Sequence, residues 1–409
     1  MLLILLACAP QRETRVAEVL EWNAELPEDL RQAKYCKMAE SPHAFFRGAN
    51  HLFWEEHLED PRLEAFGGDL RTGAWLQGDL HALNYGSFHD DDGRIVYDLN
   101  DFDEVLVEDY QLDLWHLAIS VELLSRELRV GDVRALPEAY RESMGRFQGT
   151  DRELQLRLDA DSAWGRVDDF LEDVERLDRD DMLEEWTEGA ELAHDSKLEA
   201  LDDETWERVA AALDHRYRVL DVARRLDAGT GSLGVERFYV LVDDGGRRRI
   251  LDLKEQGEPS ALAFAKPEYS DWFEGAFDSP AERVVVGHKA LAHDVDDHLD
   301  NLEIDGLSLT VRELSPWKKS FPLAELDSDA RFEKLVDQWA YLAAGAHARS
   351  DRDHDEDWLP YSLEDEVLDR IGDQSLSFDR LVVDVAIDGA DQMEAEHEAL
   401  VEWLEDSCE

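Results

Sequence analysis

Residues 75–105 read WLQGDLHALNYGSFHDDDGRIVYDLNDFDEV, a segment in which carboxylates and amides crowd between apolar runs. The polar residues that stand out are Asp79, Asn84, Asp101 and Asp103. One interpretation is an acidic surface hairpin, because carboxylates are common throughout this chain. The other is a site whose oxygen atoms hold a hard cation such as Mg²⁺ and activate a substrate. The spacing of these residues favours the second interpretation.

Asp79 and Asn84 are five positions apart, as in the D-x-x-x-x-N pattern of a kinase catalytic loop. In that loop the aspartate lies beside the attacking hydroxyl, and the asparagine reaches a Mg²⁺ ion. Asp101 precedes Phe102 and follows a predicted strand, as the metal-binding aspartate of a kinase does. We therefore predict that Asp79 is the catalytic base or orienting group. Asn84 and Asp101 are the predicted metal ligands, with Asp103 as an additional one.

A second motif occupies residues 229–256, GTGSLGVERFYVLVDDGGRRRILDLKEQ. Gly229, Gly231 and Gly234 form G-x-G-x-x-G before a strand, a D-G-G hairpin turn and a second strand that carries Lys254. A dinucleotide fold would place such glycines between a strand and a helix. The order found here is typical of the glycine-rich loop that covers ATP phosphates in kinases, with the lysine pairing the α- and β-phosphates. The three glycines and Lys254 are therefore predicted to bind nucleotide; the alternative is an ordinary hairpin with an exposed lysine.

The remaining pattern predicts an α+β fold, mostly helical. We expect helices over 13–60 with a break at ESPHAFFRG, and two strands at 73–79 and 94–101 joined as a hairpin through HDDDG. Residues 110–128 repeat apolar residues at helical spacing, and 135–225 resemble amphipathic helices with acidic faces. Further on we expect a helix capped by Ser279 and Glu282, a strand in LSLTVREL, and helices from 331.

Three segments follow from this pattern: a helical lobe with the catalytic loop and metal-binding hairpin (1–225), a β-rich nucleotide-binding lobe (226–320), and helices that complete the helical lobe (321–409). Kinases run in the other order, from glycine loop to catalytic loop. The fold is therefore predicted to be a two-lobed, kinase-like one with a circular permutation, which a compact fold tolerates when its ends lie close together.

The chain has 98 acidic and 42 basic residues, a net charge of −56, and nine of the basic residues are lysines. So strong a negative field disfavours nucleic acid and anionic membrane as partners. Acid excess with scarce lysine is typical of proteins that work in concentrated salt, where the Debye length falls to about 3 Å at 1 M and self-repulsion is screened. We interpret the chain as a halophile's cytoplasmic protein; cooperative folding in salt-free buffer would contradict this.

The cysteines and the first residues indicate little. Cys8, Cys36 and Cys408 form no C-x-x-C pair, so we expect neither a disulfide scaffold nor a structural zinc site. The apolar start MLLILLACAPQR is too short to span a bilayer. It is expected to be a buried strand or a misplaced start codon rather than a lipoprotein signal, because no basic residue precedes the apolar run.

These motifs carry a family resemblance. GDLHALN, DLNDFDE and DLWHLA resemble the catalytic segment of the aminoglycoside and choline phosphotransferases, which share the protein-kinase fold. More closely, the chain resembles the prokaryotic family catalogued as domain of unknown function 2252. The matching stretches, between residues 37 and 351, are KMAESPHAFFRG, GDLHALNYG, NDFDE, GTGSLG, LDLKE, ERVVVGHK and GAHARSD. This resemblance implies a kinase-like fold with no settled substrate.

The function expected from both lines of argument is ATP- and Mg²⁺-dependent phosphoryl transfer to a small-molecule hydroxyl or amine. Two departures from the kinase pattern keep a non-catalytic nucleotide-binding regulator open: Gln77 stands where kinases carry histidine, and Asp252 faces the same side as Lys254, where adenine would need an apolar surface. A metal-dependent hydrolase built on His81 is a third alternative with too few histidines nearby. We interpret His347 as a core or helix-end histidine.

Overall fold

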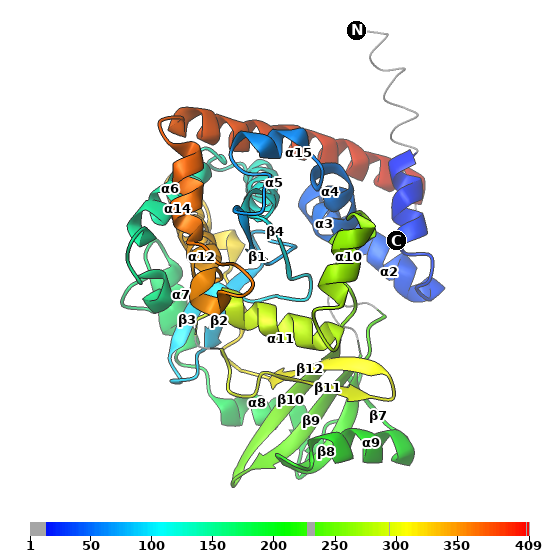
Figure 1. Ribbon diagram of the computed structural model, residues 1–409. Coiled ribbons are helices and arrows are strands. Elements are labelled where there is room, and N and C mark those ends of the chain that lie inside the picture. Colours follow the sequence, from blue (N-terminus) through cyan, green and yellow to red (C-terminus); the bar gives the residue numbers. More distant parts are fainter. Residues whose placement is uncertain (1–13, 227–233, 294, 406, 409) are drawn as a thin grey trace.

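The computed structural model describes residues 14–226, 234–293, 295–405 and 407–408 and shows a mixed α/β architecture (Figure 1). Gly229, Gly231 and the apolar start lie outside the described residues, whereas Gly234 lies within them. In addition to helical residues 14–22, the α-helices are α2 (Glu28–Met38), α3 (Pro42–Gly48), α4 (Asn50–His57), α5 (Tyr110–Leu128), α6 (Ala135–Phe147), α7 (Val167–Val174), α8 (Arg179–Trp186), α9 (Asp203–Leu213), α10 (Pro267–Glu274), α11 (Pro280–Leu291), α12 (Asp329–Arg349), α13 (Arg352–Asp355), α14 (Leu363–Ile371) and α15 (Ser375–Leu404).

The strands are β1 (Gly73–Leu76), β2 (Tyr85–His89), β3 (Ile95–Leu99), β4 (Leu106–Asp109), β5 (Thr187–Glu188), β6 (Glu191–Leu192), β7 (Leu198–Ala200), β8 (Arg218–Arg225), β9 (Arg237–Asp244), β10 (Arg247–Glu255), β11 (Asp300–Ile304), β12 (Leu307–Glu313) and β13 (Lys319–Ser320). Short 3-10 helices are η1 (Pro61–Ala65), η2 (Glu153–Gln155), η4 (Ser260–Ala263) and η5 (Leu323–Glu325).

An antiparallel six-stranded sheet with the order β11-β12-β10-β9-β8-β7 forms one end of the molecule (Figure 1). The predicted hairpin of β9 and β10 is confirmed, and its turn glycines, Gly245 and Gly246, have φ of 62° and 94°. The expectation of helices throughout 135–225 is wrong for β5 to β8. In β8, apolar residues such as Val222 pack into the sheet core, while β7 and β9 satisfy its backbone.

The segment 75–105 pairs differently from the prediction. β1 pairs with β4 through Trp75 and Val107, and β2 pairs with β3 through Tyr85 and Leu99. The expected direct hairpin between 73–79 and 94–101 is therefore wrong, because the HDDDG turn closes β2 onto β3 instead. As a result, the residues between β1 and β2, which include Asp79 and Asn84, form a loop beside both pairs of strands.

Helix α5 is the centre of the helical part and begins and ends as the apolar spacing predicts. Asp109 caps it by accepting a hydrogen bond from the Gln111 N–H at 3.0 Å. The leucines and isoleucine of its apolar face are buried, and each such side chain contributes about 1.5–3 kcal/mol relative to exposure. Gly389 of α15 lies against Ile119, so the long helix α15 packs closely across α5.

Helix α11 connects the sheet to the helical part (Figure 1). Ser279 caps it as predicted, accepting from the Glu282 N–H at 3.2 Å, while the Glu282 carboxylate reaches back to the Asp278 N–H at 2.5 Å. A side chain at Gly287 would meet Val105 at 2.6 Å, so glycine lets α11 approach the segment that follows Asp101. No helix in the described part of the chain is both long and apolar enough to cross a membrane.

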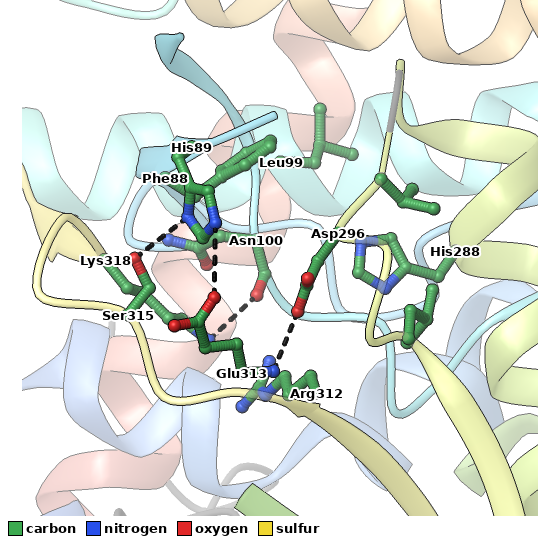
Figure 2. A pocket seen from close by; sticks show the side chains of 12 residues that line it. Phe88, His89, Leu99, Asn100, His288, Asp296, Arg312, Glu313, Ser315 and Lys318 are labelled. Atoms are coloured by element: carbon green, nitrogen blue, oxygen red, sulfur yellow. Dashed lines mark hydrogen bonds and ion pairs between the residues drawn. The ribbon is translucent and has the colours of Figure 1, made fainter. Parts of the chain in front are cut away.

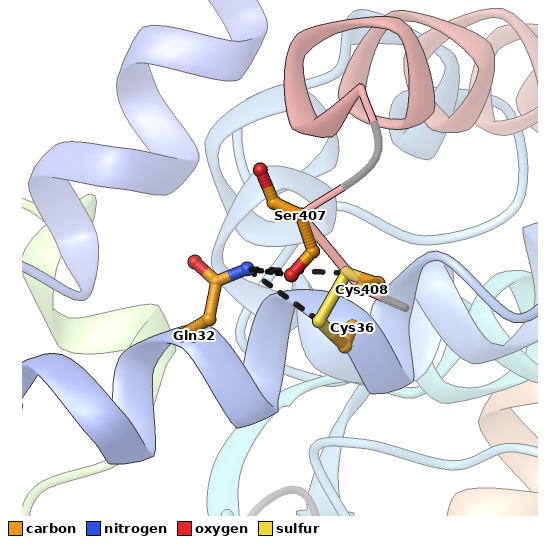
Figure 3. Close-up of a disulfide and its surroundings, with 4 residues drawn as sticks. All are labelled: Gln32, Cys36, Ser407 and Cys408. Atoms are coloured by element: carbon orange, nitrogen blue, oxygen red, sulfur yellow. Dashed lines mark hydrogen bonds between the residues drawn. A yellow bond between two sulfur atoms is a disulfide. The ribbon is translucent and has the colours of Figure 1, made fainter.

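A disulfide joins Cys36 of α2 to Cys408 near the chain end (Figure 3). The sequence expectation concerned a disulfide scaffold and did not anticipate this single pair. The two residues are 372 positions apart, so nothing in their local spacing reveals the pair. Beside the disulfide, the Gln32 side chain donates to the Ser407 carbonyl at 3.1 Å, and this holds the last residues against α2.

We expect Cys36→Ser to lower the free energy of unfolding by about 2 kcal/mol, since the crosslink restricts the unfolded chain. Guanidinium unfolding of wild type and variant, each with and without reductant, measures this. Reductant should lower the stability of the wild type and leave Cys36→Ser unchanged. Equal stability of all four samples would show that the crosslink does not form in solution.

Candidate functional site

The loop between β1 and β2, which carries Asp79, is held by its backbone. Asp113 of α5 accepts hydrogen bonds from the N–H groups of Gln77 at 2.6 Å and Gly78 at 3.0 Å. Gly78 has a φ of 82°, and a side chain there would meet the Glu104 carbonyl oxygen at 2.0 Å, so only glycine fits. These contacts fix the backbone directly before Asp79.

A buried histidine supports Asp113. His347 of α12 places Nε2 3.3 Å from the Asp113 carboxylate, and its Nδ1 lies 2.8 Å from the Tyr140 hydroxyl. His347 is fully buried, in agreement with its interpretation as a core histidine. Through Asp113, the GAHARSD helix thus supports the loop that carries Asp79.

The Asp79 carboxylate lies between two imidazoles. Its Oδ2 is 3.7 Å from His81 Nε2, and its Oδ1 is 3.5 Å from His116 Nε2, separations too long for good hydrogen bonds. Asp79 Oδ1 and His116 Nε2 are buried without a hydrogen-bond partner. Burial, together with the carboxylates of Glu104 and Asp101, raises the pKa of Asp79 well above its ordinary value. A carboxylate in this state suits proton transfer from a bound hydroxyl.

Asn84 and Asp101 are joined to the same loop. The Asn84 side-chain amide donates to the Asp79 carbonyl at 2.9 Å. Gln77 accepts from the Asp79 N–H at 2.9 Å through Oε1 and donates to the Asp101 carbonyl through Nε2. Gln77, in the position where kinases carry histidine, therefore connects the Asp79 loop to the segment after β3. Metal binding by Asn84 and Asp101 stays a prediction.

Lys254 finds its carboxylate partner in Asp103. The Lys254 ammonium forms an ion pair with one Asp103 oxygen, and the Gln256 amide donates to the other at 3.0 Å. Burial raises the pKa of Asp103, but Lys254 and Arg312 outweigh it, and the net pKa lies below the ordinary value. Asp103, predicted as an additional metal ligand, thus holds the sheet and the segment after β3 together, across 151 positions of sequence.

The same segment is fastened to α11. The ring of Phe102 stacks on His288, with centroids 3.9 Å apart. Arg283, which is buried, donates to the carbonyls of Asp103 at 2.9 Å and Gly257 at 2.8 Å. Position and orientation of the 101–103 segment therefore depend on both α11 and the sheet.

The sheet surface beside Lys254 is charged rather than apolar. Asp252, two residues earlier on β10, is buried and pairs with Arg237 of β9, with Nε at 2.6 Å, and with Arg312 of β12 at 3.5 Å. Lys318 interacts electrostatically with Asp252 as well as with Asp101. The basic side chains of Lys254, Arg237, Arg312 and Lys318 thus lie close together around Asp252 and Asp103. Such a group of cations in a strongly acidic chain suits an anionic ligand.

A cavity of about 60 Å³ lies beside this surface, between β2, β3, the end of β12 and the segment that follows it (Figure 2). Lys318 borders the cavity and donates to the Asn100 carbonyl at 3.4 Å, one residue before Asp101. Leu99 and Phe88 give it an apolar side. The cavity is large enough for water molecules but not for a nucleotide base.

His89, Asp296 and Glu313 also border this cavity, and their ligand atoms lie within 4.8 Å of one another (Figure 2). Glu313 already pairs with Arg179 at 2.8 Å and Arg249 at 2.7 Å. Burial raises the pKa of Glu313. His89 and the two arginines lower this pKa by more than burial raises it, so the net pKa is about 2. A carboxylate neutralised by two guanidinium groups is a poor cation ligand, so this cluster is a structural ion-pair network.

A protein-family model described as "Uncharacterized protein conserved in bacteria (DUF2252)" matches residues 26–403. The chain belongs to the DUF2252 family. Comparison with curated proteins and with solved structures found no match. The resemblance read from the motifs is confirmed at the level of the family.

In this DUF2252 chain, sequence reasoning missed several residues that build the site. Asp113, Arg283 and His288 were not predicted as site residues, although they lie in the motifs DLWHLA and ERVVVGHK. These motifs were the available signal, because polar residues inside apolar helices are buried and normally need hydrogen-bond partners. Of the predicted nucleotide-binding residues, Lys254 lies at the site, and Gly234 has a φ of 86° and lies against Leu26.

Proposed function

We propose that this DUF2252 protein is an ATP- and Mg²⁺-dependent phosphotransferase acting on a small-molecule hydroxyl or amine. The observation that carries the proposal is the ion pair between Lys254 and Asp103. It brings the predicted phosphate-binding strand to the segment 101–103, which Gln77 in turn joins to Asp79. The predicted base, metal ligands and phosphate ligand are thereby joined through one chain of contacts.

The side chains fit a magnesium nucleotide. Asn84 and Asp101 offer oxygen ligands, the kind that Mg²⁺ prefers. In the described part of the chain, no hydrogen bond involves the Asp101 carboxylate, so its oxygens are free to bind a cation. Bound Mg²⁺ would neutralise phosphate charge. Lys254 and the glycine segment ending at Gly234 would hold the phosphates.

In the proposed reaction Asp79 takes the proton of the acceptor hydroxyl. The hydroxyl oxygen forms a bond to the terminal phosphorus of ATP while the bond from that phosphorus to its bridging oxygen breaks, and ADP leaves with the electron pair. Asp79 suits the first role because its side chain is 22% exposed, and a base must come within hydrogen-bond reach of the proton that it takes. Positioning and charge neutralisation supply the remaining rate enhancement.

The proposal includes a circularly permuted, kinase-like fold. A strand hairpin with a lysine, a helix and three further strands follow the Asp79 loop here, whereas in kinases the corresponding parts precede the catalytic loop. Helix α11 follows the lysine strand after η4 and α10, and its His288 stacks on Phe102. These placements support the permutation. The location that we propose is a halophile's cytoplasm, although the Cys36–Cys408 disulfide is more typical of oxidising compartments.

A nucleotide-binding regulator without catalysis is the second candidate. The buried Arg237–Asp252 pair favours it, because it occupies the side of the sheet where a kinase presents an apolar surface to adenine. A protein that keeps a charged surface there binds a base poorly or by polar contacts. Such a regulator would bind nucleotide without hydrolysing it or transferring its phosphate.

ATP turnover and binding in multimolar KCl distinguish the two candidates. We expect ADP to form when Mg²⁺, ATP and an acceptor from a hydroxyl and amine panel are all present, and chelation of Mg²⁺ to stop it. Calorimetric binding of Mg²⁺-ATP without ADP formation for any acceptor would favour the regulator. Neither binding nor turnover would reject both.

A further inference from the structure

Helices α3 and α4 contact the Asp79 loop, and α2 packs against α3. Asn50 and Trp54 of α4 both donate from their side chains to the Gly78 carbonyl at 3.1 Å. Arg47 of α3 donates from Nε to His81 at 3.3 Å. Helices α3 and α4 are thereby fixed to the residues on both sides of Asp79. The proposed phosphoryl transfer assigns these helices no role.

Two cations on these helices, Arg47 and Lys34, form no ion pair within the described residues. Apart from the bond from Nε, the Arg47 side chain has no hydrogen bond or ion pair with another residue in the described part of the chain, so its two terminal nitrogens are available. The Lys34 side chain of α2 likewise has none within the described residues. Arg47 acts electrostatically on Asp79, and Lys34 on Glu104, which itself acts on Asp79.

Buried polar atoms without partners lie beside these cations. His51, only 3% exposed, has an Nε2 atom with no hydrogen bond, and Lys34 acts on this imidazole electrostatically. Asn50, 8% exposed, has an Oδ1 atom with no hydrogen bond. Such groups normally find a partner in protein or in a bound molecule. Asn50 lies at the Asp79 loop through its bond to Gly78, and His51 lies near Lys34, which indicates that a polar ligand completes these atoms.

We propose that Arg47 and Lys34 bind an anionic group of the acceptor, a phosphate or carboxylate, while the acceptor's hydroxyl faces Asp79. A guanidinium with two free terminal nitrogens matches the two oxygens of such a group, and a lysine adds a point charge. His51 and Asn50 line the same side. This inference rests on the proposed phosphotransferase function and names its substrate class: an anionic hydroxyl compound.

The same two cations could instead meet the terminal phosphate of ATP. The arrangement favours the acceptor, because Lys254, Arg237, Arg312 and Lys318 already gather at the sheet. Arg47 lies on α3, which contacts the loop next to Asp79, and Lys34 lies on α2, which packs on α3. Phosphate titration in the presence of an ATP analogue distinguishes a subsite for the acceptor's anionic group from a subsite for the terminal phosphate of ATP.

Inorganic phosphate is the probe, titrated calorimetrically in KCl onto the full chain saturated with a non-hydrolysable ATP analogue and Mg²⁺. We expect saturable phosphate binding that Arg47→Gln and Lys34→Gln each weaken by about tenfold to a hundredfold, the scale for charged hydrogen bonds. Lys37→Gln, on the same helix as Lys34, is the matched control and should bind like the wild type. If Arg47→Gln fails to fold, Arg47→Lys and Lys34→Gln keep the test decisive.

Turnover gives an independent readout. Glycerol 3-phosphate and glycerol, or glycerate and glycerol, are compared as acceptors; Arg47→Gln should raise the KM of the anionic compound and leave the Kd of ATP unchanged. Phosphate binding that is unaffected by both variants, or that the ATP analogue abolishes, would overturn the acceptor subsite. Absence of binding by the ATP analogue would reject the proposed function instead, and phosphate titration of the free protein would then still show whether Arg47 binds anions.

Discussion

Asp79→Asn is expected to lower the rate of phosphoryl transfer by about 10²-fold or more, the range for a general base, with ATP affinity almost unchanged. The carboxylate lies between His81 and His116 with its Oδ1 unpaired, so it can accept a proton, whereas an amide of the same shape cannot. Lys254, the proposed phosphate ligand, pairs with Asp103 rather than with Asp79. ADP formation in multimolar KCl at saturating acceptor gives the rate, and calorimetry gives the ATP dissociation constant.

Asp92→Asn is the matched control for this experiment. Asp92 lies in the turn between β2 and β3 with a side chain 58% exposed, and the same change of charge there should leave turnover unaltered. Turnover of Asp79→Asn equal to that of the control would mean that Asp79 does not act on the nucleophile. A fall in ATP affinity equal to the fall in rate would place Asp79 among the nucleotide ligands instead.

Local patterns predicted the parts of the fold whose causes are local. Helix α5 begins and ends where its apolar spacing and the Asp109 cap place it, and the β9–β10 hairpin follows from its glycine turn. The capped start of α11 is read from Ser279 and Glu282. Each of these features depends on residues within a few positions of one another.

Features that depend on distant partners could not be predicted. β1 pairs with β4 rather than with the strand at 94–101, and only the tertiary arrangement decides between these two partners. β8 has the composition of either a helix or a strand and becomes a strand because the sheet accepts it. The Cys36–Cys408 pair spans 372 positions, beyond the reach of any spacing rule.

In the candidate site as well, local features were predicted from the sequence and contacts between distant residues were not. The spacing of Asp79 and Asn84 identified the loop, and the Asn84 amide does return to the Asp79 carbonyl. The ion-pair partner of Lys254 is Asp103, which the sequence predicted only as an additional metal ligand. Asp103 was assigned from its neighbour Asp101 alone, so its approach to β10 could not be inferred without the three-dimensional structure.

Mg²⁺-ATP is expected to stabilise the folded protein by about 2.7 kcal/mol at a hundredfold excess over its dissociation constant, because it binds only the folded state. Asp101→Asn should remove most of that stabilisation. The substitution deletes a charged oxygen ligand but keeps the side-chain shape, and the Asp101 carbonyl still accepts from Gln77. Denaturant unfolding with and without Mg²⁺-ATP, in the same KCl concentration, measures the difference for each variant.

Asp79→Asn distinguishes a specific loss at Asp101 from a general effect of removing acid charge near the cleft. Asp79 and Asp101 interact electrostatically, so substituting either one by asparagine changes the electrostatic potential at the other. If Asp101 binds the metal and Asp79 acts on the acceptor, Asp79→Asn retains nearly all of the nucleotide stabilisation. ATP without Mg²⁺ should stabilise wild type and Asp101→Asn alike, because the missing ligand then has no cation to hold. Equal loss in both variants would show that the roles of the two aspartates are assigned wrongly, and full retention in Asp101→Asn would exclude this carboxylate as a metal ligand.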